Sequence, residues 1–284
     1  DVACGHYHTL FLDSQGKLYS MGRNDKGQLG IGKTTRQNRA THVLSNVAAI
    51  AAKGDTSFAI DKEGNLYAWG DNGYGQLGTG DTKHQNKPKK VLTKVKEVYP
   101  GGKHTFVKKS DGNVYGWGNN ANGQLGFKSS TAKQLSPQKI GKYATVAAGT
   151  AHSLFLDENN VAYGAGSNHQ YQLGFSKKGN VAKPTVVKKA ISAIYAGDKN
   201  SVLIDMQGKY YHIMGTNQYT AEEPREKRAK RELPVGHKTV VNLGVKYGSI
   251  ESALSALEPD ANPYRGLSMA SNVATQGWEV KPAA

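Results

Sequence analysis

The sequence repeats itself with a period of 48 residues. The tetrapeptide Gly-Gln-Leu-Gly begins at Gly27, recurs one and two periods later, and returns once more with tyrosine in place of its first glycine. One column of tyrosines keeps the same step: Tyr19, Tyr67, Tyr115, Tyr163 and Tyr211. A unit of this length cannot bury an apolar face alone, so it must stack on its neighbours. The sequence therefore predicts an array of modules whose function lies on its surfaces.

Short β-strands are predicted within each unit. Residues 9–12 and 17–21 are β-prone runs separated by an Asp-Ser-Gln-Gly turn, which is the pattern of a hairpin. Small and apolar residues precede later hairpins, as at residues 47–52, and a weaker strand follows near residues 88–92. The first hairpin has no evident strand before it. Three or four short strands per unit predict the blades of a β-propeller, and five hairpins are visible.

The repeated motif carries a family resemblance. Residues 69–78 read Trp-Gly-Asp-Asn-Gly-Tyr-Gly-Gln-Leu-Gly, and Gly-x-x-His and Asp-x-x-Gly elements precede such strings. Over residues 2–217 this pattern resembles the repeat of the regulator of chromosome condensation (RCC1) family. The resemblance implies an all-β fold, a β-propeller of RCC1-like blades, which in that family closes with seven blades. Since five are visible, we expect an incomplete ring, a smaller propeller, or a ring completed by the tail or by another chain.

The repeat pattern sets the predicted domain boundaries. Residues 1–220 are assigned to the propeller, residues 221–238 to a highly charged linker, and residues 239–284 to an irregular C-terminal tail that could dock on another chain. Within the tail, the sequence predicts a strand at residues 239–243 and a short helix at residues 249–257.

The recurring polar residues are interpreted as architecture. The column that begins at His8 also contains Thr56 and Asn200, which suits a hydrogen-bonding role better than catalysis or metal binding. Cys4 has alanine or proline at its counterparts, so we expect it to pack rather than react. Four asparagines should cap turns through their amides and tolerate left-handed dihedrals: Asn24, Asn72, Asn120 and Asn168.

Several function classes lack support in the sequence. It contains no phosphate-binding Gly-rich loop with a following Lys-Ser/Thr, no paired-cysteine motif and no His-Glu-x-x-His. We therefore predict no enzyme, no cofactor, no metal site and no catalytic residue. No apolar run approaches the roughly 18 residues that a membrane span needs, and no signal segment is evident. A single cysteine excludes an internal disulfide and leaves the compartment undetermined.

Positive charge is the second informative feature. The formal net charge is +15, and lysines gather between each Gly-Gln-Leu-Gly motif and the next unit. The second and fourth units carry the strongest groups: Lys83, Lys87, Lys89, Lys90 and Lys94, and Lys177, Lys178, Lys183, Lys188 and Lys189. Since equivalent segments occupy equivalent places on a propeller, these ten lysines should form a basic arc, called here the lysine rim. The rim would attract a polyanion, or would only keep the protein soluble.

The polyanion could be nucleic acid, an acidic protein surface or an anionic glycan. Arginines are few in the repeats and aromatic residues do not interleave with the basic segments, so base reading and stacking have little support.

Three functions remain open at this stage. The first is a non-catalytic recognition or scaffold module that binds another macromolecule through its blade loops and the lysine rim. The second, implied by the RCC1 resemblance alone, is guanine-nucleotide exchange on a small GTPase of the Ran type. The third is a structural component of a larger assembly, such as a virion or cell-surface appendage. The partner would be a small GTPase or an assembly neighbour, and the oligomeric state is undetermined.

Overall fold

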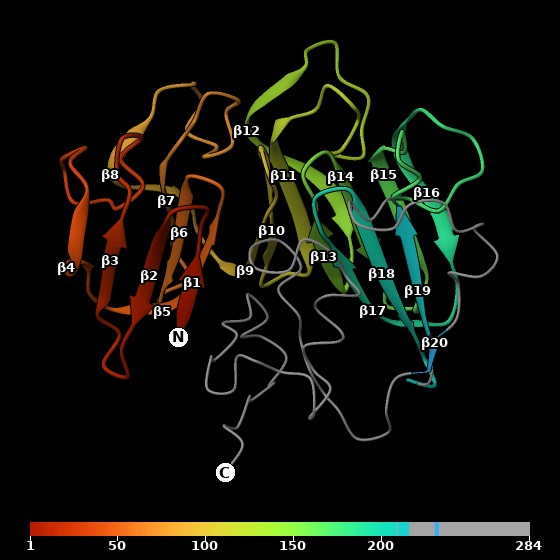
Figure 1. The fold of residues 1–284 in the computed structure, drawn as a ribbon, viewed down its shortest axis with the longest axis horizontal. Helices are drawn as coiled ribbons and strands as arrows, with labels where there is room; N and C mark the ends of the chain where they lie inside the picture. The colour runs from red at the N-terminus through yellow and green to blue at the C-terminus, as the bar shows by residue number, and fades with distance from the viewer. Residues whose placement is uncertain (209, 216–230, 233–284) are drawn as a thin grey trace.

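The described part of the chain folds into five antiparallel sheets of four strands each, and each sheet is one blade. The computed structural model describes residues 1–208, 210–215 and 231–232 (Figure 1). In this part of the chain the strands are joined by turns and loops, and no helix occurs. Strands follow one another in chain order within every sheet, because each strand pairs with the one before it. The predicted all-β architecture of RCC1-like blades is confirmed.

The strand bounds follow the 48-residue period closely. Blade 1 contains β1 (Val2–Cys4), β2 (His8–Leu12), β3 (Leu18–Gly22) and β4 (Gln37–Leu44). Blade 2 contains β5 (Val47–Lys53), β6 (Thr56–Asp61), β7 (Leu66–Gly70) and β8 (Gln85–Leu92). Blade 3 contains β9 (Val95–Pro100), β10 (His104–Lys109), β11 (Asn113–Asn119) and β12 (Lys133–Lys142). Blade 4 contains β13 (Thr145–Ala148), β14 (His152–Leu156), β15 (Ala162–Ser167) and β16 (Asn180–Lys188). Blade 5 contains β17 (Ile191–Ala196), β18 (Asn200–Asp205), β19 (Tyr210–Gly215) and β20 (Arg231–Glu232).

Two details differ from the sequence expectation. The first hairpin does have a preceding strand, because β1 pairs with β2 through Val2 and Phe11, so that expectation is wrong. Its three residues are too few to show a strand pattern in sequence. In blade 5, β20 lies inside the predicted charged linker and pairs with β19. The rest of that linker, the predicted strand at 239–243 and the predicted helix at 249–257 lie outside the described residues.

The described blades form an arc that does not close, as expected for an incomplete ring (Figure 1). Because the strands alternate in direction, the loops after the first and third strands of every blade meet at one end of the sheets. We call this end the long-loop face; it is the upper edge in Figure 1. The other end carries tight turns, such as the one in which Asp13 Oδ1 accepts hydrogen bonds from Gln15 N and Lys17 N.

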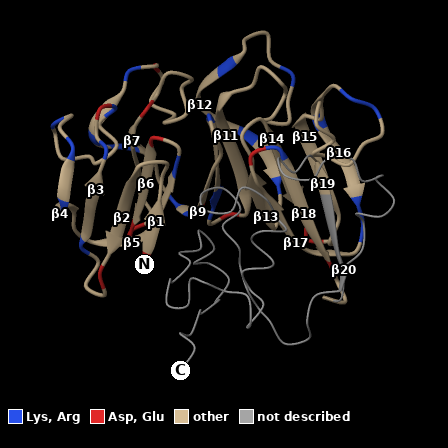
Figure 2. Cartoon of the chain, viewed as in Figure 1, with Lys and Arg blue, Asp and Glu red and all other residues tan. Residues whose placement is uncertain are grey.

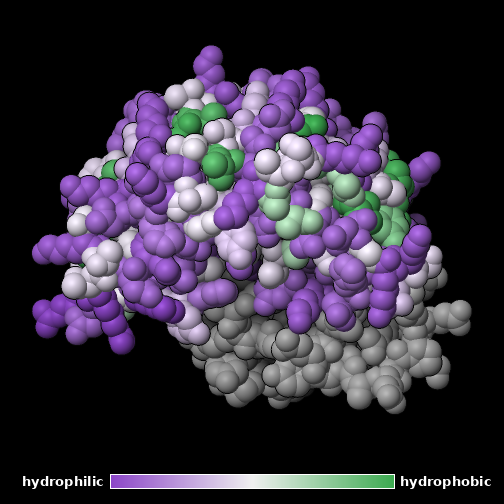
Figure 3. All heavy atoms as spheres, turned by 90° about the horizontal axis from the view of Figure 1, so that it is seen from above, coloured by the Kyte–Doolittle hydropathy of each residue, from purple (hydrophilic) through white to green (hydrophobic). Residues whose placement is uncertain are grey.

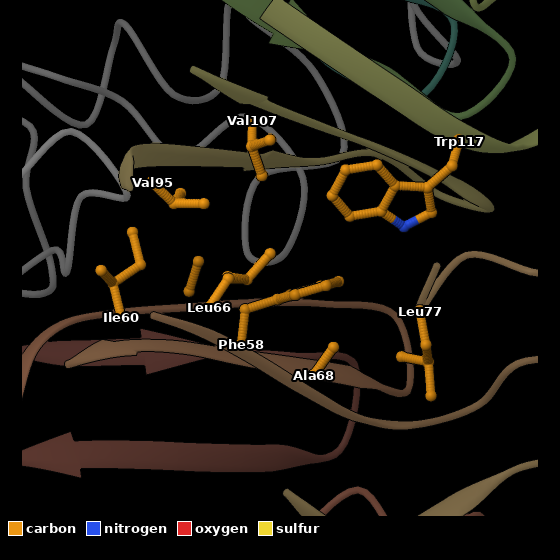
Figure 4. Close-up of a cluster of buried hydrophobic side chains, with 9 residues drawn as sticks. Phe58, Ile60, Leu66, Ala68, Leu77, Val95, Val107 and Trp117 are labelled. Atoms are coloured by element: carbon orange, nitrogen blue, oxygen red, sulfur yellow. The ribbon is translucent and has the colours of Figure 1, made fainter. Parts of the chain in front are cut away.

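The hydrophobic core lies between blades rather than within them. Four buried clusters each join two consecutive blades. At the junction of blades 2 and 3, Phe58 and Leu77 pack with Trp117 of the next blade (Figure 4). All three side chains are fully buried. The tyrosine column is half-buried beside these clusters at Tyr67, Tyr115 and Tyr163, so it adds to the packing between blades.

The Gly-Gln-Leu-Gly motif fastens each blade to the next. Trp117 Nε1 donates a hydrogen bond to Gln76 O at 2.8 Å, and Leu77 is buried beneath the loop. Gly78 has a φ of 75°, and a Cβ there would lie 2.8 Å from the Trp117 ring. Only glycine meets both demands, since other residues resist positive φ and would displace the indole.

Candidate interaction surface

A buried histidine–serine pair joins consecutive blades near their inner strands. His8 Nε2 lies 2.8 Å from Ser57 Oγ of blade 2. The equivalent pairs His104–Ser153 and His152–Ser201 each have a distance of 2.9 Å. Because the Ser57 hydroxyl donates to Gln28 O at 2.7 Å, His8 must donate through Nε2 and carry no proton on Nδ1. These pairs confirm the predicted hydrogen-bonding role of the histidine column.

The environment of these histidines opposes their protonation. The Nδ1 atoms of His8, His104 and His152 are buried and have no hydrogen-bond partner among the residues described. Burial, with a smaller contribution from His6, lowers the pKa of His8 to about 4. Burial likewise lowers the pKa of His104 to about 3 and that of His152 to about 4. A neutral imidazole suits a structural contact, because an added proton would be a buried charge without an acceptor.

Blade 2 replaces the histidine and a nearby glycine together. A glycine stands three residues before each of the three histidines, and a Cβ on Gly101 would lie 2.5 Å from His104 Cε1. In blade 2 the two positions hold Lys53 and Thr56, and Thr56 Oγ1 donates to Lys53 O at 2.6 Å. The smaller threonine leaves room for a side chain at position 53. A comparison of single columns does not show that these two positions change together in blade 2.

Side-chain amides hold the long loops in place. Asn72 Oδ1 accepts a hydrogen bond from Leu77 N at 3.0 Å, and Gln76 Oε1 accepts one from Tyr74 N at 2.8 Å. The same pairs recur at Asn24–Leu29, Asn120–Leu125 and Asn168–Leu173. The predicted capping role is confirmed, whereas none of the four asparagines has a positive φ. The long-loop face is therefore a set of similar rigid frames that present different exposed residues.

The ten lysines of the lysine rim lie on the outermost strands of blades 2 and 4 and on the loops at their ends. Lys87, Lys89 and Lys90 lie on β8, and Lys183 and Lys188 lie on β16. Figure 2 shows lysines and arginines of the chain in blue. The remaining five lie in the adjoining loops: Lys83, Lys94, Lys177, Lys178 and Lys189. All ten are exposed.

Most of this charge is not neutralised within the described chain. Of the ten lysines, Lys89 alone has an ion pair in the described part, with Asp81 at 4.0 Å. A lysine-rich outer strand also discourages edge-to-edge pairing with other sheets, which is a sufficient structural reason for part of the pattern. Ion pairing with an anionic partner would use the same uncompensated groups.

A second basic feature appears on the long-loop face, where three tyrosines each lie beside a cation. Arg23 lies over the Tyr7 ring at 5.5 Å, and Lys178 lies over Tyr171 at 5.1 Å. Tyr74 has two such neighbours, Lys103 at 4.1 Å and Lys133 at 5.2 Å from its ring centroid. Figure 3 views this face from above and shows a mostly hydrophilic surface with scattered apolar side chains.

The contacts of Tyr74 were missed in the sequence because their members are distant along the chain. Tyr74 belongs to blade 2, while Lys103 and Lys133 belong to the next blade. Basic and aromatic residues of different blades therefore come together on this face, which the composition of one basic segment does not show.

Two further kinds of site were sought in the described residues. No group of three or more histidine, cysteine or carboxylate side chains there could hold a metal ion. No helix in that part of the chain is long and apolar enough to cross a membrane. Cys4 is half-buried on β1.

The fold and the loop frames together define a β-propeller built from interlocking repeats, and sequence comparison places it in a family. The family model of the RCC1-like domain matches residues 1–253. The chain therefore belongs to the RCC1-like domain family.

Individual relatives match short segments. The human probable E3 ubiquitin-protein ligase HERC6 is 38% identical over 64 residues, which cover 21% of this chain and 6% of that protein. The human regulator of chromosome condensation is 35% identical over 48 residues, which cover 17% of this chain and 11% of that protein.

Solved structures match over a larger part. Human WBSCR16 is 25% identical with a TM-score of 0.65, covering 72% of this chain and 57% of that one. Yeast RCC1 (Prp20), solved bound to Kap60, is 21% identical with a TM-score of 0.71, covering 83% of this chain and 61% of that one. A further structure of Prp20p from Saccharomyces cerevisiae, described with its binding properties to Gsp1p and histones, has a TM-score of 0.64. The chain thus spans about three fifths of these solved chains.

Proposed function

We propose that this chain is a non-catalytic recognition module that binds an acidic protein partner through its long-loop face and the lysine rim. The observation that carries the proposal is the set of ten exposed lysines on blades 2 and 4, of which a single one has an ion pair in the described residues. Uncompensated charges of one sign attract a partner of the opposite sign and speed its association.

The rigidity of the surface supports this role. Asparagine and glutamine side chains fix the long loops, so little conformational entropy is lost when a partner binds. The related proteins point in the same direction, because yeast RCC1 was solved with Kap60 and Prp20p is described with Gsp1p and histones.

Charge reversal on one outer strand tests the proposal. The variant Lys87→Glu/Lys89→Glu/Lys90→Glu changes three exposed residues of β8. A matched control, Lys17→Glu/Lys62→Glu/Lys96→Glu, makes the same change of charge at exposed positions outside the rim. Polyglutamate and single-stranded DNA serve as defined polyanions, with binding followed by fluorescence anisotropy over a range of salt concentrations.

We expect the β8 variant to bind polyglutamate at least tenfold more weakly than the control variant, because three charge contacts are reversed. If both variants lose the same affinity for polyglutamate, net charge alone explains the loss, and a localised binding surface at the lysine rim is contradicted. Tighter binding of the DNA than of polyglutamate would assign the rim to nucleic acid instead.

Guanine-nucleotide exchange is the second candidate, and the similarity to the human regulator of chromosome condensation favours it. Its test is the release of a fluorescent guanine nucleotide from a purified Ran-type GTPase in the presence of this chain. Acceleration well above the intrinsic rate would support exchange, whereas an unchanged rate leaves the recognition role as the function.

A further inference from the structure

Three columns of the repeat meet at the first three blade junctions on the long-loop face. The first column belongs to the loop before Gly-Gln-Leu-Gly, and the second to the inner loop of the next blade. The third lies at the start of that blade's outer strand, as shown by the pairings Asn119–Lys133 and Ser167–Asn180. At the junction of blades 1 and 2 the three columns hold Lys26, Asp55 and His84. At the junction of blades 2 and 3 they hold Tyr74, Lys103 and Lys133, and at the junction of blades 3 and 4 they hold Asn122, Ala151 and Asn180.

At the junction of blades 2 and 3 these columns converge on one phenol. Lys103 Nζ donates a hydrogen bond to Tyr74 Oη at 3.0 Å and lies 4.1 Å from the ring centroid. Lys133 Nζ lies 5.2 Å from the same centroid and donates to Gly73 O at 2.9 Å. Both lysines are exposed and Tyr74 is half-buried. Two ammonium groups therefore lie close to one tyrosine ring and its hydroxyl, and we call these three residues the Tyr74 cluster.

The charge of the Tyr74 cluster sets it apart from its counterparts. Its three columns hold two cations and no carboxylate. At the junction of blades 1 and 2, Asp55 accompanies the cation Lys26, and at the junction of blades 3 and 4 all three side chains are uncharged. The carboxylate beside the Tyr74 cluster, Asp71, already accepts hydrogen bonds from Gln76 Nε2 at 2.7 Å and from Gly73 N at 3.2 Å.

The electrostatics of the phenol agree with a site in which positive charge dominates. The hydrogen bond from Lys103 lowers the pKa of Tyr74, the charges of Lys103 and Lys133 add to that effect, and the charge of Asp71 opposes it in part. Because Lys103 donates to the phenol oxygen, the hydroxyl hydrogen is available to an acceptor outside the chain.

We propose that the Tyr74 cluster binds a phosphomonoester group carried by a phosphorylated segment of a protein partner. A phosphomonoester brings nearly two negative charges and three acceptor oxygens, which match two ammonium groups and one hydroxyl donor.

A nucleic-acid strand fits the Tyr74 cluster less well than a phosphomonoester does. Its phosphodiesters carry one charge each, and the Tyr74 ring is no free stacking platform because Lys103 already lies over it. The inference rests on the proposed recognition function and names the chemistry of its contact on the long-loop face.

The chain supplies its own control variants. Tyr74→Asn/Lys103→Ala/Lys133→Asn installs the three residues that the junction of blades 3 and 4 already holds. The reverse set, Asn122→Tyr/Ala151→Lys/Asn180→Lys, would build a second cluster. Both variants use residues that the same frame accommodates elsewhere, and circular dichroism checks that the fold is kept.

The probes are O-phosphoserine, glutamate and dimethyl phosphate, titrated into the labelled full chain and followed by nuclear magnetic resonance. We expect phosphoserine to shift the signals of the Tyr74 cluster in the unaltered chain. In the first variant its affinity should fall by about tenfold or more. The reverse set should add a second responding site. Equal binding of phosphoserine to the first variant and the unaltered chain would overturn the proposal. Dimethyl phosphate binding as tightly as phosphoserine would also overturn it and favour a nucleic-acid backbone.

The outcome is separable from that of the proposed function. If the first variant loses phosphoserine binding while the β8 charge reversal leaves polyglutamate binding unchanged, the cluster stands and the lysine rim fails. If the β8 reversal weakens polyglutamate binding and phosphoserine does not bind at all, the rim stands and the cluster fails.

Discussion

The junction between blades 2 and 3 and the junction between blades 3 and 4 use the same columns of the repeat and fill them differently. At the first, Trp117 occupies the space beside Gly78. At the second, the tryptophan column holds Ala165, and a Cβ placed on Gly126 would lie 3.0 Å from Pro184 Cγ and 3.5 Å from Phe155 of the adjacent strand. Trp117 and Phe155 are both fully buried, so the space beside the glycine is filled at both junctions although the residues that fill it differ.

The inner edges of the two junctions differ in the same coordinated way. Between blades 3 and 4, His104 contacts Ser153 and requires the bare Gly101. The junction of blades 2 and 3 has Thr56 in place of the histidine and Lys53 in place of the glycine. These two junctions show that substitution in a stacked repeat is tolerated when the contacting residue in the same frame changes with it.

The largest expected effect concerns the tryptophan. Trp117→Ala should lower the free energy of unfolding by about 3–5 kcal/mol, because it opens a cavity and removes the hydrogen bond to Gln76 O. Guanidinium unfolding followed by circular dichroism measures the loss. Phe155→Ala should destabilise the chain similarly, and Phe155→Ala/Ala165→Trp should recover much of that loss. A double variant no more stable than Phe155→Ala would break the equivalence of the two junctions.

Next comes the coupling of glycine and histidine. Gly101→Lys alone should lower the free energy of unfolding by about 3 kcal/mol, because its Cβ would meet both the His104 ring and, at 2.9 Å, Gly149 O. Adding His104→Thr reproduces the pair found in blade 2 and should restore part of the stability. A double-mutant cycle gives the coupling energy, and additive effects would contradict the proposed interdependence.

The histidine junctions should also respond to acid, unlike the threonine junction. The folded-state pKa of His104, about 3, lies below its unfolded value near 6.5, so the unfolded chain takes up the proton first. Its stabilising contribution is complete above pH 6.5 and falls as the pH drops toward 3. Between pH 6.5 and pH 5 the loss should be about 1.5 kcal/mol for this residue. Gly101→Lys/His104→Thr should show a correspondingly shallower pH dependence, and an identical profile would refute the assignment.

The smallest effect on stability is expected at the Tyr74 cluster. Lys103→Ala/Lys133→Asn should change the free energy of unfolding by no more than about 0.5 kcal/mol, because both side chains are exposed. A loss well above that value would mean that the cluster holds the blades together and would redefine its role.

Much of the fold could be predicted from the sequence. The hairpins, the turns at residues such as Asp13 and the capping asparagines all lie within one repeat, so local patterns define them. The strand β1 was missed because three residues carry too little pattern, and β20 because it follows a long charged segment. The ten lysines of the rim were identified from composition, and their joint action in binding stays a prediction.

The Tyr74 cluster could not be predicted, and neither could the pairing of Gly101 with His104. Tyr74 and Lys133 are 59 residues apart, more than a full period, and come together because blade 3 packs against blade 2. A column-by-column comparison treats each position as independent. It therefore cannot show that one side chain occupies the space its neighbour leaves.

The sequence by itself determined the repeat, the strands and the residues that cap the loops, because these follow from local backbone preferences and from a period of fixed length. The tertiary structure alone decided which residues of different blades meet, how each junction is filled, and where two cations gather on one tyrosine. The physical reason is that the core and the surface sites both lie between blades. Their contacts depend on the packing of whole sheets, which no single segment encodes.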